Sequence, residues 1–291
     1  MRQIINLLLY CFKKDKPKQT KIIFMLRLLH IEWLKVKNYR TFWVLLVLMT
    51  VAIPSFCYIV FDETDNSFPK FKGKSILGSP FSFPEVWATV PWFSSLVLFI
   101  PAVLIITLVT NEFVFKTHRQ NVIDGWSRTQ FITVKMIEVV ILAVYITILV
   151  FITCLAFGYS SAKPGETIEA FKNSRYIWFF LIEAISYCMV ALVISLLIKR
   201  AGLSMGIYFL YAIVLEQIVV QLLRKYANDI GRFLPLEVTD RLTPQPFIQK
   251  FRGEEASKAL ENGIPIFLAV SAVYILLYVF LCNYKFRKSD L

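Results

Sequence analysis

The sequence predicts an all-α membrane protein with six transmembrane helices, preceded by an amphipathic helix at the membrane interface. Of its 291 residues, 57% are hydrophobic and only 18% are charged, whereas a soluble domain carries about 25% charged residues. The apolar residues form long unbroken blocks, and about 20 apolar residues suffice for a helix to cross the hydrocarbon core. These blocks do not alternate between apolar and polar residues, as the strands of a membrane barrel would. Composition and block length therefore favour transmembrane helices.

The region before the first apolar block divides into two predicted segments. Residues 1–20 are expected to be a cytoplasmic extension, and residues 21–40 are expected to form an amphipathic elbow helix. In the second segment Leu29 and Trp33 belong to an apolar face, whereas Arg27 belongs to a basic face. A helix with one apolar and one basic face typically lies in the plane of the membrane surface. A soluble helix packed on a partner is the alternative, but the position directly before a span favours the interfacial helix.

Residues 41–282 are predicted to form the transmembrane domain, and residues 283–291 a cytoplasmic tail. Each of the six apolar blocks is about as long as a membrane-spanning helix needs to be. The six predicted spans are 41–61, 92–110, 136–158, 176–198, 203–223 and 264–282. The longest loop, 224–263, is rich in charges of both signs, and we expect it to form short helices on the outer surface.

The distribution of basic residues predicts the orientation in the membrane. The two ends of the chain and the connections 111–135 and 199–200 contain nineteen Lys and Arg residues and five acids, whereas the other three connections contain thirteen and twelve. Because Lys and Arg accumulate on the cytoplasmic side, both termini are expected in the cytoplasm. We therefore expect an integral protein of the bacterial cytoplasmic (inner) membrane, with membrane lipids as partners. No nucleic-acid partner is expected, because the net charge of +12 follows membrane sidedness.

The sequence predicts no catalytic, cofactor or metal site in this chain. It contains neither HExxH nor GxGxxG, which mark zinc proteases and dinucleotide sites. Residues 73–75 resemble the end of a phosphate-binding loop, but Phe68 stands where that motif needs glycine. The two histidines, His30 and His118, lie too far apart for paired zinc ligands, and no cysteines have CxxC spacing. ATP and Mg would therefore have to be bound by another chain.

Three acidic residues, Glu138, Glu183 and Glu216, fall within the predicted spans. A charged side chain at the bilayer centre costs about 2.5 kcal/mol or more, so such residues usually face the interior of a helix bundle. Glu138 lies near the start of its span and can reach the headgroups, whereas the other two lie deeper. For Glu183 and Glu216 two interpretations stay open, a structural contact between helices and a path for substrate or protons.

The cytoplasmic connection 111–135 is polar and compatible with a helix. Gly125 would end that helix, and Ser127 would cap the next one. It is either a plain connection or a docking surface for a soluble partner. The residues expected to form the docking surface are Glu112, Lys116, Thr117, His118, Arg119, Gln120, Asn121 and Asp124.

From about residue 20 to its end, the chain resembles the permease subunits of type-2 ABC transporters. The resemblance rests on the elbow helix with Arg27 and Trp33, on the six-span plan, and on a loose motif after the second span. The residues that match this motif are Glu112, Thr117, Ser127-Arg128, Phe131 and Lys135.

The resemblance implies a transport subunit without enzymatic activity of its own. Two permease subunits, identical or different, would enclose the translocation path. A separate soluble ABC ATPase would dock beneath the cytoplasmic loop and the elbow, and would bind the ATP and Mg. The substrate would be an exported hydrophobic or amphipathic compound.

Two other classes of protein stay open. One is a membrane-embedded enzyme that acts on lipid or peptide, with Glu183 or Glu216 as acid or base. No nucleophile and base accompany these acids in the sequence, which argues against this class. The other is a membrane anchor or sensor that moves with an ATPase and transports nothing. Substrate-stimulated ATP hydrolysis separates a transporter from an anchor.

Overall fold

In the computed structural model the described residues are 27–66, 70–71, 74–75, 80–117, 120, 123, 126–162, 170–226, 230–243, 245 and 253–288. The chain forms two compact units, Met1–Val44 and Leu45–Leu291. The predicted extension 1–20 and the first part of the predicted elbow helix lie outside the described residues.

The first unit contains a short helix that leads into the first span. Residues 27–36 are helical, and α2 (Arg40–Asn66) begins after a three-residue connection. Trp33 lies edge-on to both Phe42 and Trp43, with ring centroids 6.3 Å apart in each pair. Such edge-to-face contacts stabilise aromatic clusters beyond the area that they bury. A helix therefore precedes the first span, and its location at the membrane surface stays a prediction.

The second unit is helical apart from one small hairpin, in the part of the chain that the structure describes. After α2, its α-helices are α3 (Val86–Ser95), α4 (Phe99–Val114), α6 (Arg128–Ser161), α7 (Arg175–Ile198), α8 (Ala201–Phe209), α9 (Glu216–Tyr226), α10 (Glu237–Asp240) and α12 (Gly253–Lys288). A π-helix, η2 (Leu210–Leu215), joins α8 to α9, and a 3-10 helix, η3 (Ile230–Phe233), precedes α10. The two-residue strands β1 (Lys70–Phe71) and β2 (Lys74–Ser75) pair antiparallel.

Long apolar helices confirm the predicted fold class. Five helices are long and apolar enough to cross a membrane, namely Arg40–Glu63, Arg128–Ser161, Arg175–Ile198, Ala201–Tyr226 and Asn262–Lys285. The helices α3 and α4 meet the same test together, as a pair bent by 44°. The described residues thus form an all-helical membrane protein with five candidate spans, or six if the bent pair is one span.

The second span, predicted as one helix over 92–110, is broken between α3 and α4. Pro101 has no backbone N–H and cannot donate a hydrogen bond to the carbonyl of Val97. Val97 and Leu98 instead bond to carbonyls three residues earlier, those of Ser94 and Ser95. A proline that interrupts the hydrogen-bond ladder is a common cause of a sharp helix kink.

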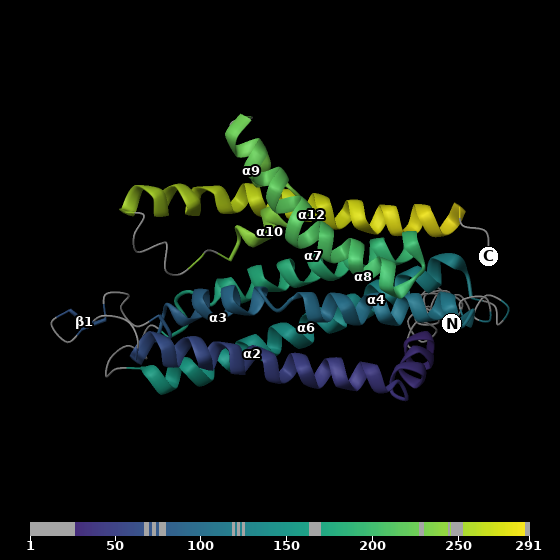
Figure 1. The fold of residues 1–291 in the computed structure, drawn as a ribbon, viewed down its shortest axis with the longest axis horizontal. Helices are drawn as coiled ribbons and strands as arrows, with labels where there is room; N and C mark the ends of the chain where they lie inside the picture. The colour runs from purple at the N-terminus through teal and green to yellow at the C-terminus, as the bar shows by residue number, and fades with distance from the viewer. Residues whose placement is uncertain are drawn as a thin grey trace, which may run out of the picture. The chain divides into compact units, whose positions relative to one another are not determined.

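Helix α7 lies at the centre of the second unit, where it contacts α3, α4, α6, α8, α10 and α12 (Figure 1). Several of its buried positions carry small side chains, among them Ala184, Ala191 and Ser195, which are fully buried. Small residues let helix backbones approach closely in a membrane, where van der Waals packing supplies much of the attraction between helices. The close packing around α7 places its polar residues inside the bundle.

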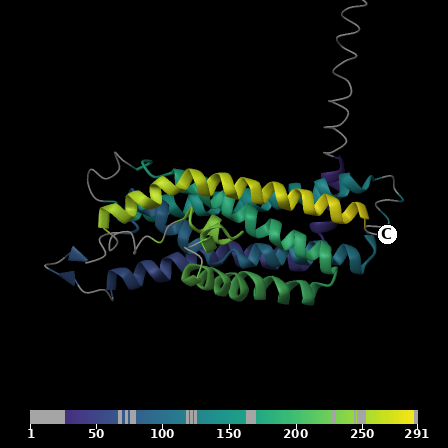
Figure 2. The same ribbon diagram turned by 90° about the horizontal axis from the view of Figure 1, so that it is seen from above.

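The connection between α9 and α12 does not lie wholly on the outer surface, which corrects the expectation for loop 224–263. Its residues 230–243 pack between α7, α9 and α12 at mid-length of the bundle (Figures 1 and 2). Leu236, Val238 and Leu242 in this segment are at most 2% exposed. Because these apolar side chains are buried among the helices, the backbone of the segment also lies inside the bundle.

Candidate functional site

A cluster of polar residues joins α7 to the segment 230–243, and we call Glu183, Tyr187, Asp240 and Thr243 the polar ladder. The hydroxyl of Thr243 donates to Oε2 of Glu183 at 2.6 Å. The hydroxyl of Tyr187 donates to the carboxylate of Asp240, at 3.0 Å to Oδ1 and 3.2 Å to Oδ2. Residues four apart on a helix share one face, so Glu183 and Tyr187 present both groups to the same segment.

The polar ladder lies near the middle of the spans. Glu183 and Tyr187 are the ninth and thirteenth of the 24 residues of α7, which places Tyr187 about 18 Å from the start of the helix. Tyr274, near the middle of the span Asn262–Lys285, donates to the backbone carbonyl of Phe233 at 2.8 Å. Two helices thus hold residues 230–243 through side chains from their central turns, and the segment re-enters the bundle.

Glu216 holds the same segment from the other side. This residue follows the π-helix η2, and its Oε1 accepts hydrogen bonds from the backbone N–H groups of Leu236, at 2.6 Å, and Glu237, at 3.0 Å. Hydrogen bonds from backbone N–H groups to a carboxylate are among the stronger kinds in proteins. Both deep acids therefore have partners within the chain, as the structural interpretation expects. Whether they also line a path is a separate question.

The polar ladder brings together two acidic side chains, one fully buried and one half-buried. Glu183 is fully buried, Asp240 is half-buried, and the two carboxyls repel each other electrostatically. The carboxylate of Asp240 is held by the hydrogen bond from Tyr187. The nearby Arg241 pairs with Glu237 at 2.8 Å. Within the part of the chain that the structure describes, no basic side chain forms an ion pair with Glu183 or Asp240.

A second polar cluster joins the two helices that flank the loop between α4 and α6, which is predicted to be cytoplasmic, and we call Glu112, Lys135 and Glu138 the loop anchor. Lys135, on α6, forms an ion pair with Glu112, near the end of α4, and also lies 3.3 Å from Glu138. The side chains of Lys135 and Glu112 are only 2% and 9% exposed. The ammonium group of Lys135 also lies 5.6 Å from the ring centre of Phe131.

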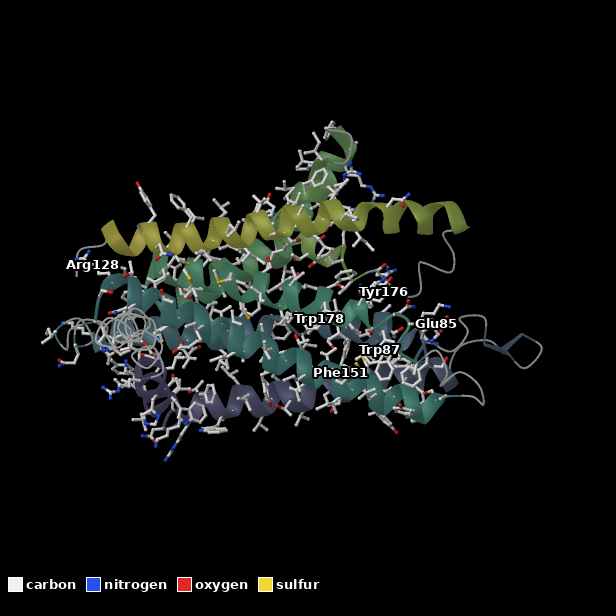
Figure 3. The ribbon with its side chains drawn as sticks, turned by 180° about the vertical axis from the view of Figure 1, so that it is seen from behind. Glu85, Trp87, Arg128, Phe151, Tyr176 and Trp178 are labelled. Carbon is white, nitrogen blue, oxygen red and sulfur yellow. The ribbon has the colours of Figure 1, made fainter. Side chains whose placement is uncertain are left out.

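Both ends of the loop are also marked by local features that begin or end a helix. Ser127 and Gln130 form a capping box at the start of α6, as the predicted cap at Ser127 requires. At the end of α4, Lys116 has a positive φ of 55°, a conformation in which helices commonly terminate. The two ends of the second unit can be located by labelled residues. Arg128, the first residue of α6, lies near one end, whereas Trp87 and Phe151 lie toward the other (Figure 3).

The structure places Glu112, one of the predicted docking residues, in the loop anchor. Its side chain is buried against Lys135 and does not present an exposed contact for a partner. Of the other predicted docking residues, Lys116 and Gln120 are exposed and Thr117 is half-buried. His118, Arg119, Asn121 and Asp124 lie outside the described residues. The loop also exposes two apolar side chains that were not among the predicted docking residues, Phe115 at 70% and Ile123 at 77% exposure.

In the elbow helix, both predicted residues are on the outside of the described part. Arg27 is exposed, and Trp33 is 49% exposed. The buried positions are instead Leu28 and Glu32. Glu32 forms an ion pair with Lys35 at 2.7 Å. An exposed tryptophan is compatible with a helix whose apolar face contacts lipid headgroups.

A hydrolase-like pattern, GxSxG, spans Gly202 to Gly206, but its surroundings do not fit a nucleophile. The pattern functions on a sharp turn between a strand and a helix, whereas here it lies inside helix α8. Ser204 is completely buried. Among the described residues, no group of three His, Cys, Asp or Glu side chains could hold a metal ion.

The sequence alone did not identify Asp240, Tyr187 or Thr243 as members of a site. Asp240 stands between Thr239 and Arg241, and residues 230–243 include four charged residues, Arg232, Glu237, Asp240 and Arg241. Hydropathy therefore gave no signal that this segment re-enters the bundle.

Together these features define a polytopic helical membrane protein with a re-entrant segment held by acidic side chains and a loop between α4 and α6 whose flanking helices are joined by a buried ion pair. The chain belongs to DUF2705, a family of proteins of unknown function, whose family model matches residues 43–291. No curated protein matches the chain significantly.

Proposed function

We propose that this chain is the membrane-spanning permease subunit of an ATP-driven transporter of the type-2 ABC class. The observation that carries the proposal is the loop anchor, which ties α4 to α6 on either side of the loop at 115–127. Because its two ends are joined by a buried ion pair, the loop moves together with both helices. A force applied to the loop by a partner is therefore passed into the helix bundle.

The exposed part of the loop supports a docking role. Phe115 and Ile123 expose apolar side chains beside the cation Lys116 and the amide Gln120. Apolar anchors within a polar rim are the usual composition of a protein interface. The partner we propose is a soluble ABC ATPase that binds the ATP and Mg, because the sequence of this chain offers no phosphate-binding loop.

The proposal places the loop and both termini in the cytoplasm, since the basic residues of the chain gather on that side. It places the chain in the bacterial cytoplasmic membrane. A second permease subunit, identical or different, completes the translocation path. The apolar character of the spans suits export of a hydrophobic or amphipathic compound.

The test uses the chain co-expressed with an ABC ATPase encoded beside its gene, purified and reconstituted in nanodiscs. We expect the two proteins to co-purify and to hydrolyse ATP. Lys116→Glu should weaken their association about tenfold, because charges at an interface rim steer docking. The matched control is Lys285→Glu, which reverses an exposed cation near the end of α12.

Two outcomes would contradict the proposal. One is a chain that never associates with the ATPase. The other is an equal effect of Lys116→Glu and Lys285→Glu on association and hydrolysis. Hydrolysis that depends on the loop, but that no candidate lipid or amphipathic substrate stimulates, would favour the anchor or sensor instead of the transporter.

A further inference from the structure

We propose that Glu183 and Asp240 form a proton-binding site, and that a proton bound there keeps residues 230–243 packed against α7. The ligand is a proton taken from water, which binds to a carboxylate oxygen of the pair. The site is independent of any ATPase, and nothing in the proposed transport function requires it.

The first argument is the geometry of the polar ladder. Thr243 donates to Glu183 and lies 3.3 Å from the backbone carbonyl of Asp240, so one short stretch of chain connects the two carboxyls. Tyr187 connects them a second time, because it lies one helical turn from Glu183 and donates to Asp240. Glu183 is fully buried beside a second acid, the half-buried Asp240, and burial beside another acid disfavours a second negative charge, so one of the two carboxyls holds a proton.

The second argument comes from buried oxygen atoms that have no partner in the described structure. Oε1 of Glu183 is completely buried and lacks a donor in the described part of the chain, because the nearby hydroxyl of Ser95, on α3, donates to the carbonyl of Trp92 instead. The hydroxyl of Tyr208, on α8, is likewise unpartnered, and this side chain is 1% exposed. Tyr208 lies within electrostatic range of both Tyr187 and Asp240. A proton bound to Oε1 of Glu183 removes the negative charge from an oxygen that has no donor among the described residues.

None of the neighbouring groups named below supplies an unpaired positive charge that could neutralise the two carboxyls in place of a proton. Helix α7 contributes Tyr187, α8 contributes Tyr208, and α9 contributes Glu216, whose Oε1 is occupied by two backbone N–H groups. The segment itself contributes Glu237 and Arg241, which pair with each other. Every one of these groups is therefore either uncharged, acidic or already paired to an acid.

The consequence is a packing equilibrium that depends on pH. Protonation is more favourable when the segment is packed than when it is released, so the packed form is favoured at low pH. As pH rises, the second carboxyl ionises, and repulsion within the polar ladder weakens the attachment of the segment to α7. Tyr274 and Glu216 still hold the other side of the segment, so the loss of contact is confined to the face toward α7.

The experiment measures how accessible the segment is to a thiol reagent. Val238 is completely buried in α10, and Val238→Cys, in a chain whose native cysteines are replaced by serine or alanine, reports release of the segment to N-ethylmaleimide. The labelling rate is compared, from about pH 5 to pH 9, between this protein and the same protein with Glu183→Gln and Asp240→Asn. These substitutions keep one acceptor oxygen on each side chain and remove both negative charges, as protonation of both carboxyls would. Because the thiol is the same, its own ionisation cancels in the comparison.

We expect labelling of the protein with both carboxyls to rise at least about tenfold more across this range than labelling of the neutralised protein. One pKa unit of raised proton affinity corresponds to this factor. Equal pH profiles in the two proteins would overturn the proposal, and so would complete protection of the thiol at every pH. A protein that retains Cys154 alone, which is buried on α6, shows whether the whole bundle opens.

Folding of the neutralised variant is itself informative. If the packed pair holds a proton, Glu183→Gln with Asp240→Asn must be at least as stable as the natural protein at high pH. A neutralised variant that failed to fold would therefore contradict the proposal. No ATPase takes part in any of these measurements, so failure of the transport proposal would leave this result unaffected.

Discussion

Replacing Lys135 with methionine keeps much of the length of the side chain but removes its charge from the loop anchor. The Glu112 carboxylate then stays in a position where its side chain is only 9% exposed, without this ion-pair partner. Glu138 loses the same cation but is 15% exposed and lies closer to water. The charge that loses a buried cation is therefore mainly that of Glu112.

The expected cost follows from this burial. Removing one partner of a buried ion pair destabilises a protein by about 3–5 kcal/mol, because a charge is left unpaired. Since Glu138 can stay hydrated, we expect the lower end of this range, about 3 kcal/mol, for Lys135→Met. Adding Glu112→Gln removes the negative charge of this buried side chain and should recover about 2 kcal/mol of the lost stability. The single changes are thus strongly coupled, as contacting residues usually are.

The assay is reversible unfolding of the purified protein in mixed detergent micelles, for Lys135→Met, Glu112→Gln and the double variant. Lys285→Met, at an exposed position of α12, controls for loss of a positive charge and should change stability by less than about 0.5 kcal/mol. The reasoning would be refuted if Lys135→Met had no larger effect than this control. It would also be refuted if the effects of the two single variants simply added.

Two further predictions concern packing and capping. Gly158→Ala should destabilise the protein by about 1–3 kcal/mol, because an added Cβ would lie 2.4 Å from the ring of Phe83; Gly206→Ala, with nothing within 4 Å, should be nearly neutral in the same unfolding assay. Glu216→Ala should cost about 1–3 kcal/mol, because the buried N–H of Leu236 loses its acceptor. For Glu216→Ala we expect faster hydrogen exchange at the Leu236 amide without faster exchange in α6. Exchange that becomes faster by the same factor in both places would contradict this prediction.

The membrane spans could be predicted from the sequence because their cause is local. Every backbone polar group in hydrocarbon must be bonded within its own segment, so a span has to be a long apolar helix. The bend at Pro101 is different. Proline is tolerated in many spans, and the hydrogen-bond pattern around Val97 and Leu98 shows that this one breaks the helix.

The candidate sites were predictable only in part. A carboxylate within a span must face the bundle, so Glu183 and Glu216 could be expected to have partners. The loop residue Glu112 looked like a surface contact, because its sequence neighbourhood is polar. Its burial depends on Lys135, which lies in the next helix.

Hydropathy alone predicts that this protein spans the membrane through long helices, and the order of residues shows which positions between them are polar or charged. Which of those residues meet depends on the path of the folded chain. Glu183 reaches Thr243 across 60 residues of chain, and Glu216 reaches Leu236 across 20. The physical reason is that hydropathy acts within each segment, whereas these contacts depend on how the segment 230–243 folds back between α7 and α9. Local composition does not encode that path.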